Sequence, residues 1–232
     1  MKLLALDTST SFLSVAVAEG EKILSSYHRP AHMLHSARLI PTIDSVLKKA
    51  RARLSEMDGF VLGIGPGSFT GLRIGVTTVK ALAFVTKKPV VAIPTLDAIA
   101  HNAGGFRGTV CPVLDAKKGK VYACLYESGG DKLKRISDYL LIAPDELMIM
   151  IGRKKMSREE KVLFLGDGAE VYKDALAPGD GRMEFYEGHR WHPRARVIAM
   201  LGLEKFKKKI FSDIFDLTPF YLYSKECDIK GW

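Results

Sequence analysis

Cysteine is scarce in this chain, and no two cysteines have the spacing of a metal-binding or redox pair. Three are present, Cys111, Cys124 and Cys227, and none belongs to a CxxC motif. An odd number of widely separated cysteines speaks against a disulfide scaffold and against a zinc ribbon. The composition therefore indicates a reducing compartment, and we expect a cytoplasmic protein.

Long apolar runs are missing as well. Four apolar residues follow Lys2 before Asp7 interrupts them, which is too short for the core of a signal peptide. No stretch approaches the roughly 20 apolar residues that a helix needs to cross a bilayer. The sequence therefore predicts no membrane association.

Several common catalytic motifs are absent. The chain has no GxxxxGKS/T phosphate-binding loop, no HExxH metal site and no GxSxG nucleophile elbow. Asp97 and His101 are four residues apart in a predicted helix and could share a metal ion, but two ligands without a third do not define a site. We expect no resident metal and no common hydrolase chemistry.

Positive charge is what the chain has in excess. It contains 35 Lys and Arg against 26 Asp and Glu, a net charge of +9 over 232 residues. Such an excess favours acidic partners such as tRNA. No long block of Lys or Arg dominates, so a well-solvated surface explains the charge equally well.

Hydrophobic periodicity in the first half predicts three strands and then alternating helices and strands. Strands are expected at residues 3–6, 12–17, 22–27, 59–64 and 89–93. Helices are expected at residues 34–50 and 69–85. This order predicts a mixed sheet with helices packed on it.

The glycine-rich segment at residues 102–108, NAGGFRG, is the best candidate for a boundary. Beyond it the pattern restarts more weakly, with expected strands at 110–114, 120–127, 133–140 and 162–165 and helices at the start of 144–160 and at 193–208. An Asp follows the opening strand of each half, first Asp7 and then Asp115. We therefore predict two tandem α/β subdomains, 1–104 and 105–232, with the last helix in the second.

The segment GPGSFTGLRIG at residues 65–75 is the most distinctive motif. It lies between a predicted strand and a predicted helix, so Gly67, Ser68 and the next amides would present a helix N-terminus to an anion. Alternatively, Gly67 shapes the turn, and Gly71 and Gly75 lie on one helix face and allow another element to approach. The spacing alone supports both interpretations equally.

Asp7 and the hydroxyl residues after it form a second candidate site. Carboxylate and hydroxyl oxygens of this kind are ligands that Mg²⁺ prefers. Asp and Ser also cap local turns, which explains Asp7-Thr8-Ser9 at least as well. We take Asp7, Gly67, Ser68 and Asp115 as weak candidates for a nucleotide or anion site.

The two long predicted helices of the first half carry more apolar surface than one sheet can cover. The helix at 69–85 is apolar nearly all round, and the helix at 34–50 has two apolar stripes. A partner chain could cover the second side, although a long helix buried within one domain would give the same pattern. The residues expected at such an interface are Leu39, Ile43, Leu72, Val76, Val79 and Lys80.

Five segments of this chain resemble the TsaB family. They are LALDTST at 4–10, GPGSFTGLRIGVTTVKALAF at 65–84, PTLDAIA at 94–100, VLDAKKGKVY at 113–122 and DLTPFYLY at 216–223. The resemblance covers essentially the whole chain and is densest in residues 1–126. It implies an actin-like, RNase H-like α/β fold with two tandem mixed-sheet subdomains, the second reduced.

The resemblance also implies a role in making threonylcarbamoyladenosine on tRNA. It implies a catalytic TsaD-type partner, a TsaE-type ATPase, transfer to N6 of adenosine 37, and pairing or self-pairing through the two long helices. The TsaD relative carries a metal-binding HxxxH, of which only the second histidine, His101, is kept here. We therefore expect a non-catalytic scaffold or activator without a cofactor, in which ATP or ADP with Mg²⁺ would bind only at a shared interface.

The alternative is an ATP-binding enzyme of the actin-like superfamily, with a Mg-nucleotide site between the two subdomains. Enzymes of that superfamily usually have a glycine soon after the first Asp, whereas this chain has Thr8 and Ser9 after Asp7. Direct contact with tRNA, driven by the net positive charge, is a third hypothesis.

Overall fold

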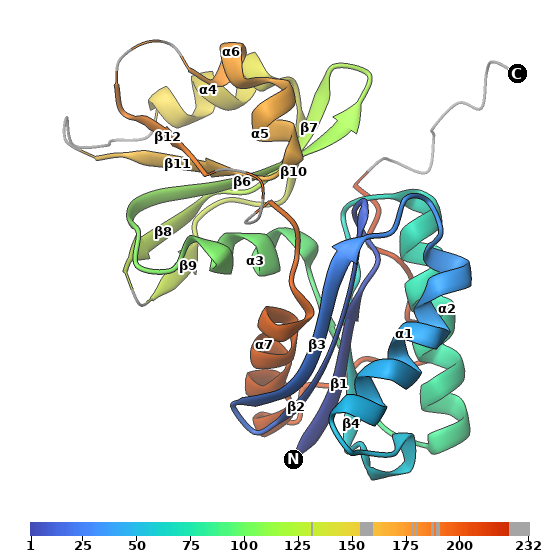
Figure 1. Cartoon of the computed structure of the whole chain (residues 1–232). Coiled ribbons are helices and arrows are strands. Elements are labelled where there is room, and N and C mark those ends of the chain that lie inside the picture. The colour runs from blue at the N-terminus through green and yellow to red at the C-terminus, as the bar shows by residue number, and fades with distance from the viewer. Residues whose placement is uncertain are drawn as a thin grey trace, which may run out of the picture. The chain divides into compact units, whose positions relative to one another are not determined.

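The computed structural model describes residues 1–130, 132–153, 160–177, 179, 181–186, 188 and 191–222. The chain forms two compact units, which are described separately below (Figure 1). Unit 1 comprises residues 1–102 and 192–220, and unit 2 comprises residues 103–191 and 221–232.

Unit 1 is built on a five-stranded mixed sheet with the strand order β3-β2-β1-β4-β5. The strands are β1 (Lys2–Asp7), β2 (Phe12–Glu19), β3 (Lys22–Pro30), β4 (Gly59–Gly63) and β5 (Val90–Ile93). The first three form an antiparallel meander, and β4 and β5 run parallel to β1. The central strands are buried on both faces, which explains their nearly continuous apolar sequences.

Helices cover both faces of this sheet (Figure 1). They are α1 (His35–Lys49), α2 (Phe69–Thr86), the short α3 (Thr95–Ala100) and α7 (Ala195–Lys207). Leu4 and Leu6 of β1 belong to the core with α1 and α2, while Leu3 and Ala5 point to the opposite face and pack with α7. Because side chains alternate along β1, this strand contributes to the apolar cores on both faces of the sheet.

Within its described residues, unit 2 has a seven-stranded sheet and three short α-helices. Its strands are β6 (Arg107–Lys117), β7 (Lys120–Ala123), β8 (Tyr126–Gly129), β9 (Leu133–Arg135), β10 (Leu140–Ile142), β11 (Val162–Leu165) and β12 (Met183–Phe185). Its helices are α4 (Pro144–Arg153), α5 (Asp167–Val171) and α6 (Lys173–Leu176). The path is β10-β7-β6-β11-β12, with β8 on β6 and β9 on β8.

The predicted α/β class with two mixed sheets is confirmed, but the last helix was assigned to the wrong half. Residues 1–104 and 105–232 were expected to fold separately, whereas α7 packs against β1 and β2 of unit 1. Ile198 and Leu203 of α7 supply apolar cover for the sheet face that α1 and α2 leave open. A single division of the sequence at residue 104 cannot describe a unit whose last helix comes from the C-terminal part of the chain.

The length and composition of α2 are those of a helix that could span a bilayer. In this fold, however, Leu72, Val76 and Val79 are buried inside unit 1. The apolar character of α2 thus has a structural explanation within the α/β unit.

Candidate functional site

Asp7 ends β1 and is completely buried. Its Oδ1 accepts hydrogen bonds from the amide of Ser9, at 2.9 Å, and from the hydroxyl of Ser9, at 2.8 Å. Its Oδ2 has no hydrogen-bond partner among the described residues. One half of the carboxyl group is therefore used by the local turn, and the other half is left without a donor.

Burial raises the pKa of Asp7 to about 7, and the two hydrogen bonds from Ser9 oppose this shift. The neighbour on the Oδ2 side is Gly63 at the end of β4, where a Cβ atom would overlap Oδ2. Asp7 is thus packed directly against the backbone of an adjacent strand.

At three glycines of the GPGSFTGLRIG segment, the loop after Asp7 occupies the space that a side chain would need. A Cβ at Gly67 would overlap the carbonyl oxygen of Ser9, and a Cβ at Gly71 would overlap the carbonyl oxygen of Thr8. A Cβ at Gly75 would overlap the hydroxyl of Thr8. Each glycine is needed because the β1–β2 loop lies against the first two turns of α2.

Hydrogen bonds stabilise the contact between the β1–β2 loop and the start of α2. The amide of Ser68 donates to the carbonyl of Ser9 at 2.7 Å, and the hydroxyl of Thr8 donates to the carbonyl of Gly71 at 2.7 Å. The hydroxyl of Ser68 caps α2 by accepting from the amide of Gly71 at 3.2 Å. Of the two interpretations of this motif, these contacts favour close packing, because the surfaces of the glycines are covered by protein.

Asp115, the remaining candidate, lies in unit 2 and has its own surroundings. Its carboxylate accepts from the amide of Lys117 at 2.8 Å and pairs with the ammonium of Lys117 at 2.6 Å. The hydroxyl of Tyr172 donates to it at 3.3 Å, and its own amide donates to Asp167 at 3.1 Å. Asp7, Gly67 and Ser68 are brought together in unit 1, whereas Asp115 belongs to a separate cluster.

Asp167 was not among the predicted site residues. It opens α5 directly after Gly166, and burial raises its pKa. The pKa of Asp115 is held low by hydrogen bonds and charge from Lys117, against the effect of burial. The signal in the sequence was the turn Gly166-Asp167-Gly168-Ala169, which resembles many other turns and so did not single out Asp167.

The structure places the imidazole of His101, considered with Asp97 as a possible metal ligand, against its own helix. Nδ1 of His101 lies 2.8 Å from the backbone carbonyl of Asp97, so this nitrogen is engaged with its own helix. Within the described part of the chain, no group of three or more His, Cys, Asp or Glu residues could hold a metal ion.

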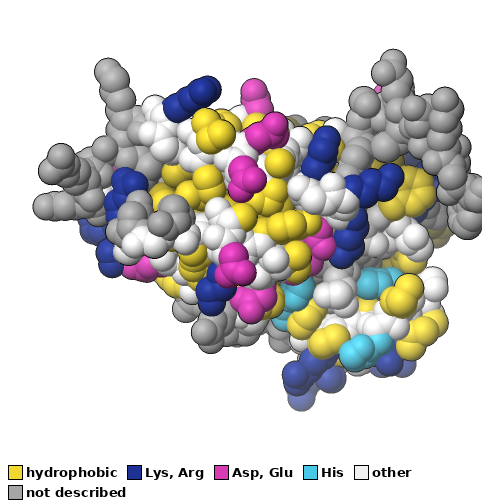
Figure 2. Space-filling model, turned by 90° about the horizontal axis from the view of Figure 1, so that it is seen from above, with side chains coloured by type: hydrophobic (Ala, Val, Ile, Leu, Met, Phe, Trp, Pro, Cys, Tyr) yellow, Lys and Arg dark blue, Asp and Glu magenta, His cyan; other side chains and the backbone are white. Residues whose placement is uncertain are grey.

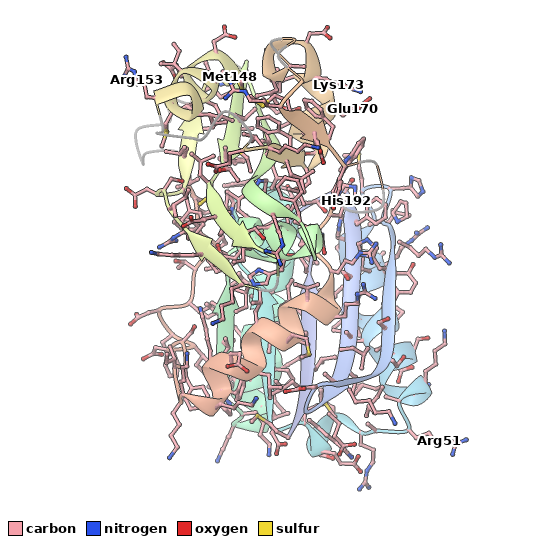
Figure 3. All side chains as sticks on the ribbon, turned by 90° about the vertical axis from the view of Figure 1, so that its left-hand side faces the viewer. Arg51, Met148, Arg153, Glu170, Lys173 and His192 are labelled. Atoms are coloured by element: carbon pink, nitrogen blue, oxygen red, sulfur yellow. The ribbon has the colours of Figure 1, made fainter. Side chains whose placement is uncertain are left out.

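Histidines meet in a buried aromatic stack on the β2–β3 side of unit 1. The ring of Phe12 stacks on His192 at 4.0 Å and lies 4.8 Å from His28. Burial lowers the pKa of both histidines to about 4, and for His28 the charge of Arg194 adds to this effect. Figure 3 labels His192 next to the strands of unit 1. Both rings are therefore neutral at neutral pH.

The prediction that Leu39, Ile43, Leu72, Val76 and Val79 contact a partner is wrong. All five side chains are buried inside unit 1. Lys80 is half-buried, and its ammonium donates to the carbonyls of Phe215 and Leu217 at 3.0 and 3.3 Å. The apolar stripes predicted for a partner are the ones that cover the sheet.

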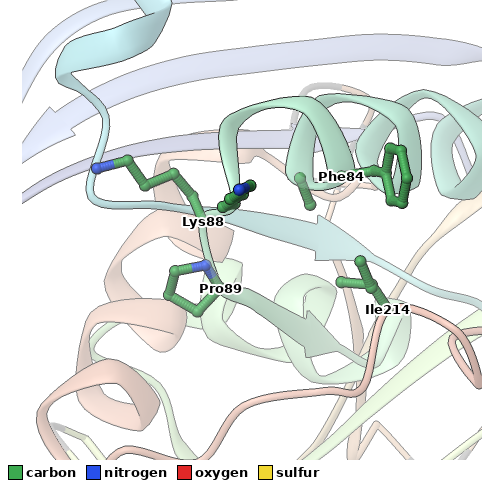
Figure 4. A pocket seen from close by; sticks show the side chains of 6 residues that line it. Phe84, Lys88, Pro89 and Ile214 are labelled. Atoms are coloured by element: carbon green, nitrogen blue, oxygen red, sulfur yellow. The ribbon is translucent and has the colours of Figure 1, made fainter.

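A pocket of about 540 Å³ opens at the C-terminal end of α2 (Figure 4). Its lining residues are Ala83, Phe84, Lys87, Lys88, Pro89 and Ile214. The pocket lies where β5 begins, and Asp7 lies where the parallel strand β1 ends. The two features are therefore at opposite ends of the sheet and do not form one site.

Comparisons with known proteins agree over the whole chain. A family model described as TsaD, tRNA N6-adenosine threonylcarbamoyltransferase, matches residues 27–228. The chain is 31% identical over 233 residues to the tRNA threonylcarbamoyladenosine biosynthesis protein TsaB of Bacillus subtilis (strain 168), covering 99% of this chain and 97% of that protein. A protein of the same name from Buchnera aphidicola subsp. Schizaphis graminum is 27% identical over 216 residues, covering 90% and 97%.

A solved structure gives the same result. The structure titled YeaZ from Pseudomonas aeruginosa superposes with a TM-score of 0.82 at 26% sequence identity. The superposition covers 95% of this chain and 99% of that one. Similarity in sequence and in structure thus extends through both units.

Proposed function

The chain belongs to the TsaB family, and from this premise we propose that it serves tRNA threonylcarbamoyladenosine biosynthesis as a non-catalytic subunit. Its role would be to bind a TsaD-type catalytic partner and hold that partner in its active form. The observation that carries this proposal is the exposed apolar face of α1 and α2.

This surface, called the partner face here, consists of Leu34, Ile40, Phe69, Phe84 and Val85. Phe84 is 66% exposed, Val85 78% and Phe69 55%. Large exposed apolar side chains on two neighbouring helices are typical of a protein–protein interface. The inward sides of the same helices are already buried in the core, so the outward side is what remains for a partner.

An aromatic–arginine pair lies on this face. The guanidinium of Arg73 lies over the ring of Phe69 at 3.8 Å from the ring centre. Aromatic and arginine side chains dominate the binding energy of many interfaces, and a cation–π contact holds the pair in one orientation before binding. The pair supports Phe69 as an anchor of the interface.

The likeness to the transferase family model supports a related chain as the partner. The match at residues 27–228 includes both α1 and α2. Two related chains can pair the same helix faces about a pseudo-twofold axis, and two copies of this chain could pair in the same way. A TsaD-type partner and self-pairing are thus both compatible with this surface.

The surroundings of Asp7 support a structural, non-catalytic role for this part of unit 1. The carboxyl group is hydrogen-bonded to Ser9 and packed on Gly63, and Thr8 and Ser9 cover three glycines of the motif, Gly67, Gly71 and Gly75. A phosphate group would need amides and space that the chain itself fills.

Reconstituted threonylcarbamoyladenosine formation tests the proposal. The mixture would contain tRNA, threonine, bicarbonate, ATP, a TsaD-type protein and a TsaE-type ATPase, with this chain added, omitted or replaced by Val85→Glu. We expect Val85→Glu to abolish association in size-exclusion chromatography and to lower product formation, because a charge would be buried at the interface. The matched control is Val171→Glu in unit 2, where the valine is 60% exposed.

Two results would contradict the proposal. Product formation that does not depend on this chain would exclude an activating role. Normal association of Val85→Glu, with unchanged melting temperature, would exclude the partner face as the interface.

A Mg-nucleotide enzyme is the second candidate, and one observation favours it. The Oδ2 atom of Asp7 is buried without a donor among the described residues, and a carboxylate oxygen is a ligand that Mg²⁺ prefers. Because Oδ2 is packed against Gly63, binding of a cation there would require this contact to open. Calorimetry of the chain with Mg-ATP tests this function. Micromolar binding that Asp7→Asn removes would support it, and the absence of heat would count against it.

A further inference from the structure

Three helices of unit 1 end at the same edge of the sheet. The ends of α1, α2 and α7 lie where β1, β4 and β5 begin and where the β2–β3 hairpin turns (Figure 1). The ring of Phe206 in the last turn of α7 packs where a Cβ of Gly59 would be, and the amide of Asp58 donates to the carbonyl of Lys2. The topology thus places segments that are distant in sequence at one edge.

Basic residues gather at this edge. Most acidic side chains there are engaged: Glu19 and Glu56 pair with Lys2, Glu21 and Glu204 with Lys207, and Asp58 accepts from the amide of Lys2. Asp213, next to the bridge between Ser212 and Val90, is exposed and accepts from the amide of Phe215. Other cations form no ion pair with any described residue. These cations, called the basic edge here, are Lys22, Lys49, Arg51, Lys87, Lys88, Lys208 and Lys209.

Three members of the basic edge occupy backbone positions that favour glycine. Arg51, Lys87 and Lys209 follow the ends of α1, α2 and α7 with φ of 51°, 56° and 54°. At α1 the amide of Ala52 reaches the carbonyl of Leu47 at 3.0 Å, the bond of a left-handed helix cap. Glycine is the usual residue at such caps because side chains are disfavoured there.

The helix dipole does not account for these three cations. Lysines within the last helical turn, such as Lys49, are favoured by the negative end of the helix. A basic residue beyond the last turn gains less from the dipole, and in the left-handed conformation it is less stable than glycine. Lys117 and Lys118 in unit 2 also have a left-handed φ, but they belong to one turn. At the basic edge three separate helices each end with a basic residue in this conformation, and such a repeated departure from the local preference indicates a functional reason.

We propose that the basic edge binds the phosphate backbone of tRNA. The members of the basic edge are exposed except for the half-buried Lys88, and none has an ion-pair partner among the described residues. A group of such cations fits a polyanion. Proteins recognise RNA phosphates and RNA shape without deep pockets. This inference rests on the proposed function only in naming tRNA as the RNA. Arg51 projects from this end of unit 1 in Figure 3.

The charge distribution elsewhere differs from that of the basic edge. Figure 2 looks down on the molecule from the top of Figure 1, and there Lys and Arg side chains are interspersed with Asp and Glu. In unit 1 the basic edge lies at the other end of the sheet. Residues 1–102 and 192–220 of unit 1 hold 18 Lys and Arg against 10 Asp and Glu, so most of the net charge of +9 lies in this unit.

Glycine substitutions make a sharp test because they suit the backbone. The triple variant Arg51→Gly, Lys87→Gly and Lys209→Gly removes three charges at positions where glycine is preferred, so the fold should be kept or stabilised. The control variant removes the same charge from exposed lysines of unit 2, with Lys118→Gly, Lys132→Ala and Lys134→Ala. Lys118 also has a left-handed φ of 53°, so the backbone change is matched at one position.

The affinity for transcribed tRNA would be measured by fluorescence anisotropy at several salt concentrations. It would be measured for the chain alone and for the chain bound to its TsaD-type partner. We expect the triple variant to bind about tenfold more weakly at low salt, with a log–log salt slope lower by roughly 0.9 for each phosphate that the variant no longer neutralises. The control variant should keep most of the affinity.

The outcomes separate this inference from the proposed function. Unchanged tRNA affinity and slope in both settings, no measurable tRNA binding in either, or an equal weakening in the control variant would each overturn it. Loss of partner association in the triple variant, with tRNA binding intact, would show that the basic edge docks an acidic protein. A failure of Val85→Glu to affect pairing would refute the partner face and leave the tRNA result standing.

Discussion

Replacing Asp7 with asparagine should remove the loss of stability that accompanies ionisation of this buried carboxyl group as the pH rises. The pKa of this carboxyl group is raised by burial from 3.8 to about 7. Because one pKa unit corresponds to about 1.4 kcal/mol, ionising Asp7 in the folded state opposes folding by up to roughly 4 kcal/mol. The group therefore destabilises the chain increasingly as the pH rises.

The sign follows from proton binding. The folded chain holds a proton on Asp7 at pH values where the unfolded chain has released it, so stability falls as the pH rises from about 4 through about 7. The penalty is fully present only above that pH. Asparagine at position 7 has no such titration and can still accept the two hydrogen bonds from Ser9 through its carbonyl oxygen.

The assay is urea unfolding followed by circular dichroism at pH 5, 7 and 9 for both proteins. The free energy of unfolding of the natural chain should fall by roughly 3 kcal/mol relative to Asp7→Asn between pH 5 and 9. The histidines contribute equally to both proteins, so they cancel in the comparison. A constant difference between the two proteins over this range would refute the raised pKa and would indicate that a cation or donor satisfies Oδ2.

Two further perturbations test neighbouring features. Gly71→Ala should destabilise the chain by several kcal/mol in a thermal melt, because its Cβ would overlap the carbonyl of Thr8; Gly104→Ala, where a Cβ meets nothing within 4 Å, should be nearly neutral. His192→Phe should keep the stacking on Phe12 and reduce acid sensitivity. Because burial lowers the pKa of His192 to about 4, its stabilising effect is complete above about pH 6.5 and is lost as the pH falls toward 4, so urea unfolding at pH 7 and pH 4.5 should show a smaller loss in the variant.

The fold could be predicted from the sequence where periodicity and turns agree. The helices at 34–50 and 69–85 and the strands of the N-terminal meander lie close to their expected positions. The second half was harder because its elements are short. The strand expected at 133–140 is in fact two, β9 and β10, separated by residues 136–139.

The expected interface shows what a single sequence cannot resolve. An α2 helix that is apolar nearly all round does not reveal which side faces the sheet, and Val79 was assigned outward although it is buried. The structure places Leu72, Val76 and Val79 in the core and leaves Phe84 and Val85 exposed. A glutamate at position 79 would therefore unfold the core rather than separate two chains.

At the three helix ends of the basic edge, a charged residue occupies a backbone position where glycine would be more stable. A non-glycine residue in the left-handed conformation costs about 1 kcal/mol relative to glycine, and Arg51, Lys87 and Lys209 each occupy such a position. If these three residues served only to keep the surface charged and hydrated, lysines elsewhere on the chain would do the same. Selection for stability would then favour glycine at all three positions. Natural proteins tolerate a locally unfavourable residue where function requires it. Binding an RNA backbone is such a requirement, because phosphates need long cationic side chains that extend beyond the helix ends.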